Sequence, residues 1–458
     1  MAQFQTNPLL LAAIVVALVA TVAALGADRA ADRMMVTFAP PHEADGELVA
    51  DVAQLTDRVE RLRGQQFVRK PKIEVLPAVE IVASIRESAP TVGAIAAKKA
   101  AAKETLQRIS GMRAENPSPE SYGFPSGLYW PATDTIFIPT EALGRPDLPV
   151  EQILVHELTH ALDHQRFGLD EPGPTRSSEA DEAVRALDEG SASFVEQLFV
   201  DRHSDGRPSS TQMLAEQYHT YDPDTYAHVD GAAVALPYLL GVRFVSTLHR
   251  RGGWNLVNEA FHHPPTTMGQ IAHPLRWLRG DDYTRPTMIK PEPSSRWRSL
   301  GFGPFGEVDT NLLLQASFTP HSSRQAAEGL DSGRWTVWRT RSAPTTCEIP
   351  CPEHTVAAIA WRWENRQEFE QFARAGHGIL ELGLDAPRLN DMVWRVDGGY
   401  ASIAGRLPGG RTMQPGIAPT WVMAFTPTAR LARRIANDTS RVASAVGQHH
   451  AGDPTPGA

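Results

Sequence analysis

The sequence predicts an α+β protein with two domains, and three observations support this. Apolar residues recur at helical spacing through most of residues 46–284, and a few short alternating runs there predict a small mixed sheet with an edge strand. A Pro-rich linker follows at residues 285–299. Beyond it, strand-like and helix-like runs alternate, which predicts a smaller α+β domain over 300–447. At 458 residues, each domain can bury a core of its own.

The amino-terminal residues predict export. From Leu9 to Ala27 the chain reads LLLAAIVVALVATVAALGA and carries no charge. A signal peptide has an apolar core of about 7–15 residues and a spanning helix has about 20, so residues 1–27 fit either a cleaved signal peptide or an N-terminal membrane anchor. Both place the rest of the chain outside the cytoplasm, either secreted or periplasmic, or attached to the membrane by this segment. Residues 28–45 are small and polar and predict a linker.

The predicted elements of the first domain follow in order. Residues 46–63 and the Ala-rich 93–110 have helical spacing, and PKIEVLP at 71–77 alternates like a strand. Residues 128–139 predict two short strands around a turn at 131–134. Further helices are predicted over 148–166, 179–201, 232–250 and 254–262.

The second domain is predicted from shorter runs. Strands are expected at 335–339, 355–363 and 421–425, and a helix at 365–375. Trp361 and Trp363 lie on one side of the middle strand, where core packing explains them more simply than a carbohydrate-binding face. The tail at 448–458 is predicted to be disordered.

Charge and cysteine usage narrow the class of protein. The net charge is −9 and no long block of Lys or Arg occurs, so no nucleic-acid partner is expected. Cys347 and Cys351 lie four residues apart, which favours a local disulfide in an oxidising compartment over free thiols. Two cysteines are too few for a structural zinc site.

The segment at residues 149–167, PVEQILVHELTHALDHQRF, carries the strongest chemical signal. His156 and His160 are four residues apart, so on a helix both imidazoles share one face and reach a single metal ion. Glu157 then lies beside the metal, where it could accept a proton from a water molecule. The pattern also arises by chance, so a surface helix with two solvated histidines is the alternative.

A third ligand is expected downstream, because catalytic zinc takes three protein ligands and a water molecule. Glu189 in the next predicted helix is the candidate. The small residues at 190–192 would let this helix approach the first one closely. Glu196 is the reserve ligand, and a solvated acidic face shared with Glu182 is the alternative.

The segments HELTHALDHQ and RALDEGSA together resemble the gluzincin metallopeptidases, whose third zinc ligand is a Glu on the following helix. The chain is more similar to a poorly characterised family of exported bacterial and archaeal proteins with HELxHALxxQ and ALxEG helices, over about residues 60–280. The resemblance implies a zincin-like catalytic domain, with His156, His160 and Glu189 holding one Zn²⁺ per chain and Glu157 as general base. That family often has an acidic residue where this chain has Ser191, which leaves the residue that orients the ligands open.

Together, the motif and the resemblance predict a zinc-dependent hydrolase, most simply a metallopeptidase with a peptide or protein substrate. Tyr238 and His273 are the candidates to stabilise the oxyanion, although His273 also fits a structural role in a turn. Asp163 and His164 fit either the orientation of the ligand imidazoles or a solvated helix end.

Three alternatives stay open at this point. Residues 134–139 are expected to be an edge strand that pairs with an extended substrate, or else an ordinary core strand. The protein could be a non-catalytic zincin-fold binding or assembly protein at the cell envelope, or a zinc hydrolase of non-peptide amides or esters, but the presence of Glu157 favours catalysis. Two His and one carboxylate also suit Fe(II), and the pairing of an HExxH helix with a glutamate helix favours zinc.

Overall fold

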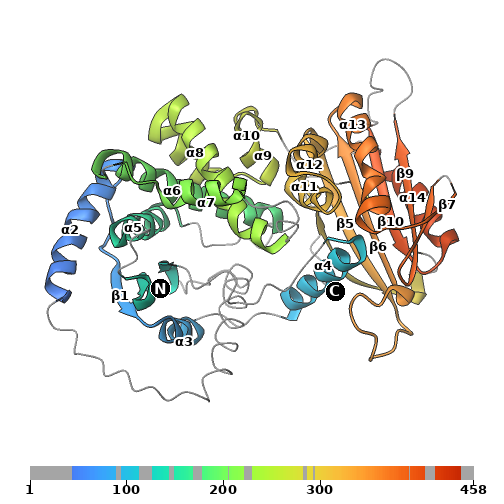
Figure 1. Cartoon of the computed structure of the whole chain (residues 1–458), viewed down its shortest axis with the longest axis horizontal. Helices are drawn as coiled ribbons and strands as arrows, with labels where there is room; N and C mark the ends of the chain where they lie inside the picture. The colour runs from blue at the N-terminus through green and yellow to red at the C-terminus, as the bar shows by residue number, and fades with distance from the viewer. Residues whose placement is uncertain are drawn as a thin grey trace. The chain divides into compact units, whose positions relative to one another are not determined.

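Contacts between Cα atoms divide the chain into two compact units, each with helices and strands (Figure 1). Unit 1 comprises the described residues within Met1–Ala96, Glu115–Asp222 and Asp230–Gly280, and unit 2 comprises those within Ala97–Ala114, Pro223–Val229 and Asp281–Ala458. The prediction of a mixed α+β fold is confirmed. The structure is a computed structural model that describes residues 44–88, 94–112, 126–143, 149–168, 178–204, 206–220, 229–281, 286–291, 294–390, 392–407 and 418–444.

The sheet of unit 1 has the order β1-β3-β2. Strand β1 (Lys72–Leu76) pairs in parallel with β3 (Thr135–Pro139), and β2 (Leu128–Trp130) pairs antiparallel with the other side of β3. Strand β3 is therefore central, and the expectation that residues 134–139 form an edge strand is wrong. The reason is the pairing with β1, which comes from a distant part of the sequence. The edges of this sheet, as described, are β1 and β2.

Both faces of β3 are buried. Ile136 and Ile138 pack in a core shared with α2 (Ala44–Arg63), α5 (Val150–Phe167) and α6 (Ser178–His203). Phe137 points the other way and packs with Trp130 against α3 (Ala78–Ser88). Because successive strand residues face opposite sides, this continuous apolar run fits a strand with a helix on each side.

The remaining helices of unit 1 follow α6 in the chain. The longest, α8, is interrupted at Gly252 and Gly253, where Gly253 has a φ of 62°. This confirms the prediction of two helical stretches on either side of these glycines. No helix in the described part of the chain is long and apolar enough to cross a membrane. The bounds are α7 (Ser210–Thr220), α8 (Val229–His262), α9 (Met268–Ala272) and α10 (Pro274–Arg279).

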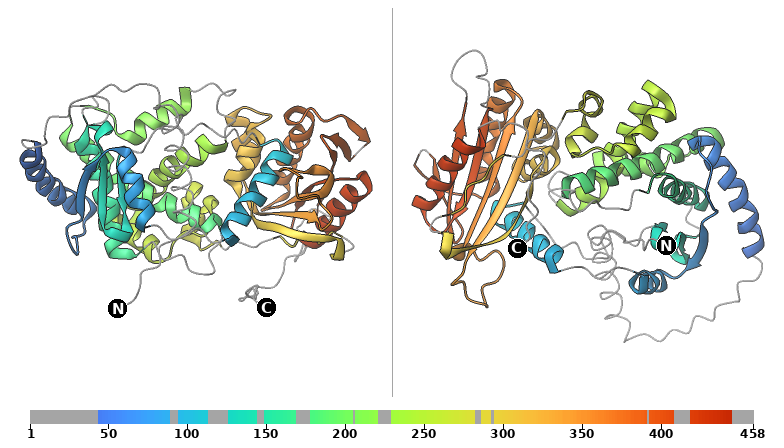
Figure 2. Two further views of the ribbon diagram at one scale, coloured as in Figure 1. Left: turned by 90° about the horizontal axis from the view of Figure 1, so that it is seen from below. Right: turned by 180° about the vertical axis from the view of Figure 1, so that it is seen from behind.

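Unit 2 is built on a seven-stranded antiparallel sheet with helices on both faces (Figure 2). Its strand order is β4-β5-β6-β10-β9-β8-β7. The strands are β4 (Trp297–Pro304), β5 (Leu330–Thr340), β6 (Thr355–Trp363), β7 (Arg388–Asn390), β8 (Val393–Val396), β9 (Gly399–Arg406) and β10 (Thr420–Thr426). The helices are α4 (Ala94–Ser110), α11 (Glu307–Gln315), α12 (Pro320–Ala327), α13 (Arg366–Gly376) and α14 (Ala429–Ala443).

The two faces of this sheet have different cores. Helix α14 packs on one face, where Ile435 joins a cluster of small and β-branched side chains from the strands. On the other face, Trp361 and Trp363 are buried, and their ring centroids lie 5.2 and 4.6 Å from that of Phe372 in α13. Core packing of these two tryptophans is therefore confirmed. The expected disulfide between Cys347 and Cys351 is also present.

Several predicted boundaries differ from the structure or cannot be compared with it. The sequence placed residues 93–110 in the first domain, whereas the contacts group most of α4 with unit 2. The physical reason is close packing, because a Cβ atom added at Gly301 of β4 would lie 2.7 Å from the Ala102 Cβ. Strand β4 begins within the predicted linker 285–299. The predicted leader at 1–27, nearly all of the linker at 28–45 and the tail at 448–458 lie outside the described residues.

Candidate metal centre

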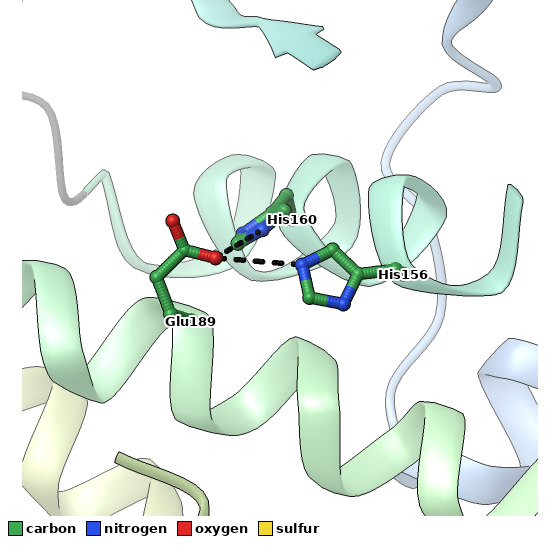
Figure 3. Close-up of side chains that lie close together, drawn as sticks. All are labelled: His156, His160 and Glu189. Atoms are coloured by element: carbon green, nitrogen blue, oxygen red, sulfur yellow. Dashed lines mark hydrogen bonds and ion pairs between the residues drawn. The ribbon is translucent and has the colours of Figure 1, made fainter. Parts of the chain in front are cut away.

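The three predicted ligands come together between α5 and α6. His156 and His160 lie one turn apart on α5, with their ring centroids 4.8 Å apart. Glu189 on α6 turns one carboxylate oxygen, Oε2, toward both imidazoles (Figure 3). This oxygen lies 3.4 Å from His156 Nε2 and 3.3 Å from His160 Nε2. The ligand atoms lie within 4.8 Å of one another, so the group could hold a metal ion. Two imidazoles and one carboxylate are a donor set that suits zinc.

Two further carboxylates contact the far side of the imidazole rings. His156 Nδ1 lies 3.3 Å from Glu196 Oε2, and His160 Nδ1 lies 3.1 Å from Asp188 Oδ2. Glu196 is itself held at the start of α7, where it accepts hydrogen bonds from the Ser210 N–H (2.7 Å) and hydroxyl (2.6 Å). Metal-binding histidines usually have such a partner on the second nitrogen, which fixes the ring orientation. Glu196, the reserve third ligand, therefore contacts the far side of the His156 ring, and Glu189 is the carboxylate placed to act as a third ligand.

The protonation of the group follows from these contacts. Burial alone would lower the pKa of His156, but its contacts with Glu189 and Glu196 outweigh burial and raise that pKa to about 9. The pKa of His160 is also raised, because Asp188 and Glu189 outweigh burial. Burial would raise the pKa of Glu189, yet the two imidazoles hold it well below its usual value. Metals bind neutral imidazole, so an ion entering this group would displace protons.

Glu157 lies beside the ligands and is buried under the segment that leads into β2. Its Oε2 accepts a 2.7 Å hydrogen bond from the Tyr129 N–H. A Cβ atom added at Gly127 would lie 2.5 Å from Ile153 Cγ2 and 3.0 Å from Glu157 Oε1, so this position needs glycine. Burial raises the pKa of Glu157. A carboxylate whose pKa is raised holds a proton more readily and is suited to take one up and release it.

Tyr238 reaches the centre from α8. Its ring stacks on His156 with a centroid distance of 6.0 Å and an angle of 26°. The backbones of α6 and α8 touch here, since a Cβ atom added at Gly190 would lie 2.2 Å from the carbonyl carbon of Gly241. The expectation that residues 190–192 let α6 approach α5 is therefore wrong for Gly190, which faces α8. Burial and the nearby Glu189 raise the pKa of Tyr238 well above its usual value, so the phenol stays protonated.

Sequence reasoning missed Arg185 and Asp188 on α6. Arg185 lies one turn before Glu189, and its Nε is 3.7 Å from Glu189 Oε1, the oxygen that does not face the imidazoles. Asp188 faces His160 from the position just before Glu189. The four-residue spacing of Arg185 and Glu189 was a signal available in the sequence. Nothing local distinguished Asp188 from the other acidic residues of this helix.

Asp163 is neither solvated nor paired with a ligand imidazole. It forms an ion pair with Arg63 of α2 at 2.8 Å, and both side chains are fully buried. The Ser191 hydroxyl donates a 2.6 Å hydrogen bond to the other oxygen of Asp163. Ser191 thus ties α6 to α5 through Asp163. His164 is half-buried, with its Nδ1 3.4 Å from the Tyr129 hydroxyl.

His273 lies at the junction of α9 and α10. Its N–H donates to the Gly269 carbonyl at 2.9 Å, and its own carbonyl accepts from the Arg276 N–H at 2.8 Å. These contacts fit the structural role that the sequence allowed. A chemical role for the His273 imidazole stays a prediction.

No family model and no curated protein matches this chain. The likeness to gluzincins therefore rests on the two motif helices. What the structure adds is the group that these helices form, in which His156, His160 and Glu189 meet. The chemistry of these side chains is therefore the basis for a function.

Proposed function

We propose that the protein is a zinc-dependent hydrolase, and specifically a metallopeptidase with one zinc ion per chain. The observation that carries this proposal is the convergence of His156, His160 and Glu189 beside the buried Glu157. Catalytic zinc sites use three protein ligands of these types and keep one position open for water. Structural zinc sites instead use four protein ligands and have no need of a neighbouring general base.

In the proposed reaction Glu157 moves the protons. Zinc bound by the three ligands would act as a Lewis acid and lower the pKa of a water molecule toward ~7. Glu157 accepts a proton from the attacking water and later donates it to the leaving amine. The Tyr129 N–H holds the Glu157 carboxylate in place through Oε2, so the base is oriented before substrate arrives.

Tyr238 is the better supported donor to the oxyanion. Its position against His156 places the phenol at the ligand group, and its raised pKa keeps the hydroxyl proton available for donation. His273 remains the second candidate. A Tyr238→Phe variant should lower kcat while leaving metal content unchanged, because the aromatic ring stays stacked on His156.

The peptide substrate is inferred from β2. This strand, and not β3, is an edge of the described sheet, and its Tyr129 N–H contacts the proposed general base. An extended peptide that paired with the outer side of β2 would be held through its backbone. A peptide bound in this way would have a peptide bond beside Glu157. This favours peptides over small amides or esters as the substrate class.

The test combines metal analysis with cleavage assays on the purified protein. Elemental mass spectrometry should find about one zinc per chain, and a Glu189→Ala variant should lose it. Wild type should cleave a peptide library, whereas Glu157→Gln should keep its zinc and lose cleavage. A protein with no zinc after reconstitution would overturn the proposal. Zinc without any cleavage would indicate a zincin-fold binding protein instead.

A further inference from the structure

Four arginines lie at one end of the β4–β5 pair in unit 2. They form two Arg-x-Arg segments, Arg296 and Arg298 at the start of β4 and Arg339 and Arg341 at the end of β5. Arg298 lies directly opposite Arg339 in the antiparallel register. The Arg341 N–H donates to the Arg296 carbonyl at 2.9 Å, so pairing continues to the outer two arginines. Directly opposite residues project from the same face of the sheet, which brings Arg298 and Arg339 side by side.

The charges of this pair are not compensated within the part of the chain that the structure describes. No ion pair there joins any of the four arginines to a carboxylate. Two nitrogens of Arg339, Nε and Nη2, are buried and have no hydrogen-bond acceptor. Burial and the adjacent Arg298 lower the pKa of Arg339. Like charges in directly opposite positions and buried donors without acceptors both destabilise a fold.

Protection of a sheet edge explains only part of this arrangement. Strand β4 is an edge of the seven-stranded sheet, and charged side chains on an edge strand discourage pairing with other molecules. That accounts for Arg298. Strand β5, however, is an interior strand, and Arg339 pairs with Thr355 of β6 on its other side. An interior, half-buried arginine needs a different explanation.

We propose that Arg298 and Arg339 form an anion site that binds a phosphate group, with Arg296 and Arg341 beside it. A guanidinium group presents several N–H donors in a planar fork that matches two oxygens of one phosphate. A bound phosphate would neutralise the opposed charges of Arg298 and Arg339. The phosphate could belong to a small soluble molecule or to a lipid headgroup. The site lies within unit 2 and does not depend on the proposed hydrolase activity.

The first test is titration of the full-length protein with inorganic phosphate at constant ionic strength. Calorimetry and the thermal midpoint of unit 2 should both report binding. Arg339→Gln should weaken phosphate binding roughly tenfold or more, because charge-assisted hydrogen bonds are lost. Without phosphate this variant should be at least as stable as wild type, because the repulsion is relieved. Arg298→Gln gives a second variant should Arg339→Gln fail to fold.

The matched control is Arg395→Gln. Arg395 is exposed on β8 of the same sheet, and its Nη1 donates to the Tyr400 hydroxyl at 3.0 Å. This substitution removes the same charge and should leave phosphate binding unchanged. Equal phosphate affinity in wild type, Arg339→Gln and Arg298→Gln would overturn the proposal, as would the absence of phosphate binding to wild type.

Vesicles distinguish the two sources of phosphate. Wild type and Arg395→Gln should sediment with phosphatidylglycerol vesicles more than Arg339→Gln does if a headgroup is the ligand, and no such difference should appear with phosphatidylcholine alone. All variants carry the same apolar amino-terminal residues, so a difference reports the arginines. Phosphate binding with equal sedimentation of all variants would assign the site to a small soluble ligand.

Discussion

The two units differ in the kind of side chain they bury. Around the candidate metal centre, unit 1 buries charged groups: Arg63 and Asp163 are 0% exposed, and Glu196 is 1% exposed. The sheet of unit 2 buries large aromatic groups instead, with Trp361 at 0% and Trp363 at 1% exposure. Removing a charge from water costs several kcal/mol, whereas burying an aromatic ring is favourable by itself.

The difference shows that specific pairs of charged side chains fix the arrangement of the helices in unit 1. Two of the buried charges of unit 1 pair with groups on another helix, Arg63 with Asp163 and Glu196 with His156. Such contacts fix the helices in one arrangement, because any shift would leave a charge unpaired. The core of unit 2 is instead stabilised by the close packing of its large aromatic side chains. Unit 1 should therefore be sensitive to single polar changes, and unit 2 to changes of side-chain volume.

The largest effect is expected for Asp163→Ala. This change leaves the Arg63 guanidinium buried without its anion, so the free energy of unfolding of unit 1 should fall by about 3–5 kcal/mol. Hydrogen exchange followed by mass spectrometry should show lost protection in α5 and α6 and unchanged protection in β6 and β10. Arg63→Met combined with Asp163→Leu removes both charges and should recover most of the loss. If Asp163→Ala alone costs less than about 1 kcal/mol, the pair does not stabilise unit 1.

Metal removal should affect the same unit by a somewhat smaller amount. A ligand present at about 100–1,000 times its dissociation constant stabilises the folded state by about 3–4 kcal/mol. Chelation should therefore lower the thermal midpoint of unit 1 and leave that of unit 2 in place. Glu189→Ala is the control, since its midpoint should not respond to chelator. An equal response in wild type and Glu189→Ala would show that any bound metal lies elsewhere.

These contacts also show which parts of the site the sequence could predict. His156, His160 and Glu157 follow from spacing within one helix, because the helical repeat alone brings four-spaced residues to one face. Glu189 follows from the chemistry of zinc and a search of the next helix. The roles of Asp188 and Glu196 depend on how α6 is rotated against α5, which no local pattern encodes.

The same limit applies to the fold. Strand β3 looked like an edge strand because its partner β1 lies far back in the chain. Arg63 reaches Asp163 across a still longer separation in sequence. Helix α14 was not predicted, although its buried residues, among them Ala432, Ile435 and Ala436, recur at helical spacing with arginines on the other face. Here the local signal was present in the sequence.

Glu196→Gln tests whether the contact between Glu196 and His156 Nδ1 contributes to metal affinity. The amide keeps the shape of the side chain but removes the charge that orients the imidazole, so metal affinity should fall about 10–100-fold. Competition with a chromogenic chelator measures this directly. Glu151→Gln, an exposed position at the start of α5, is the matched control and should bind metal like wild type. Wild-type affinity in Glu196→Gln would mean that the ring is held by packing alone.

The smallest effect is expected for Trp361→Phe, which tests the other half of the comparison. The indole N–H of Trp361 donates a 2.9 Å hydrogen bond to Thr310 Oγ1 on α11. Phenylalanine would lose this bond and leave a small cavity beside Phe372, so unit 2 should lose about 1–2 kcal/mol of its free energy of unfolding. Hydrogen exchange in β6 and β10 measures the loss, and Phe302→Leu, at an exposed position on β4, should cost much less. Metal content should be unchanged in both variants. A fall in metal affinity in Trp361→Phe would show that the aromatic core of unit 2 is energetically coupled to the metal centre in unit 1. The two units would then not be stabilised independently.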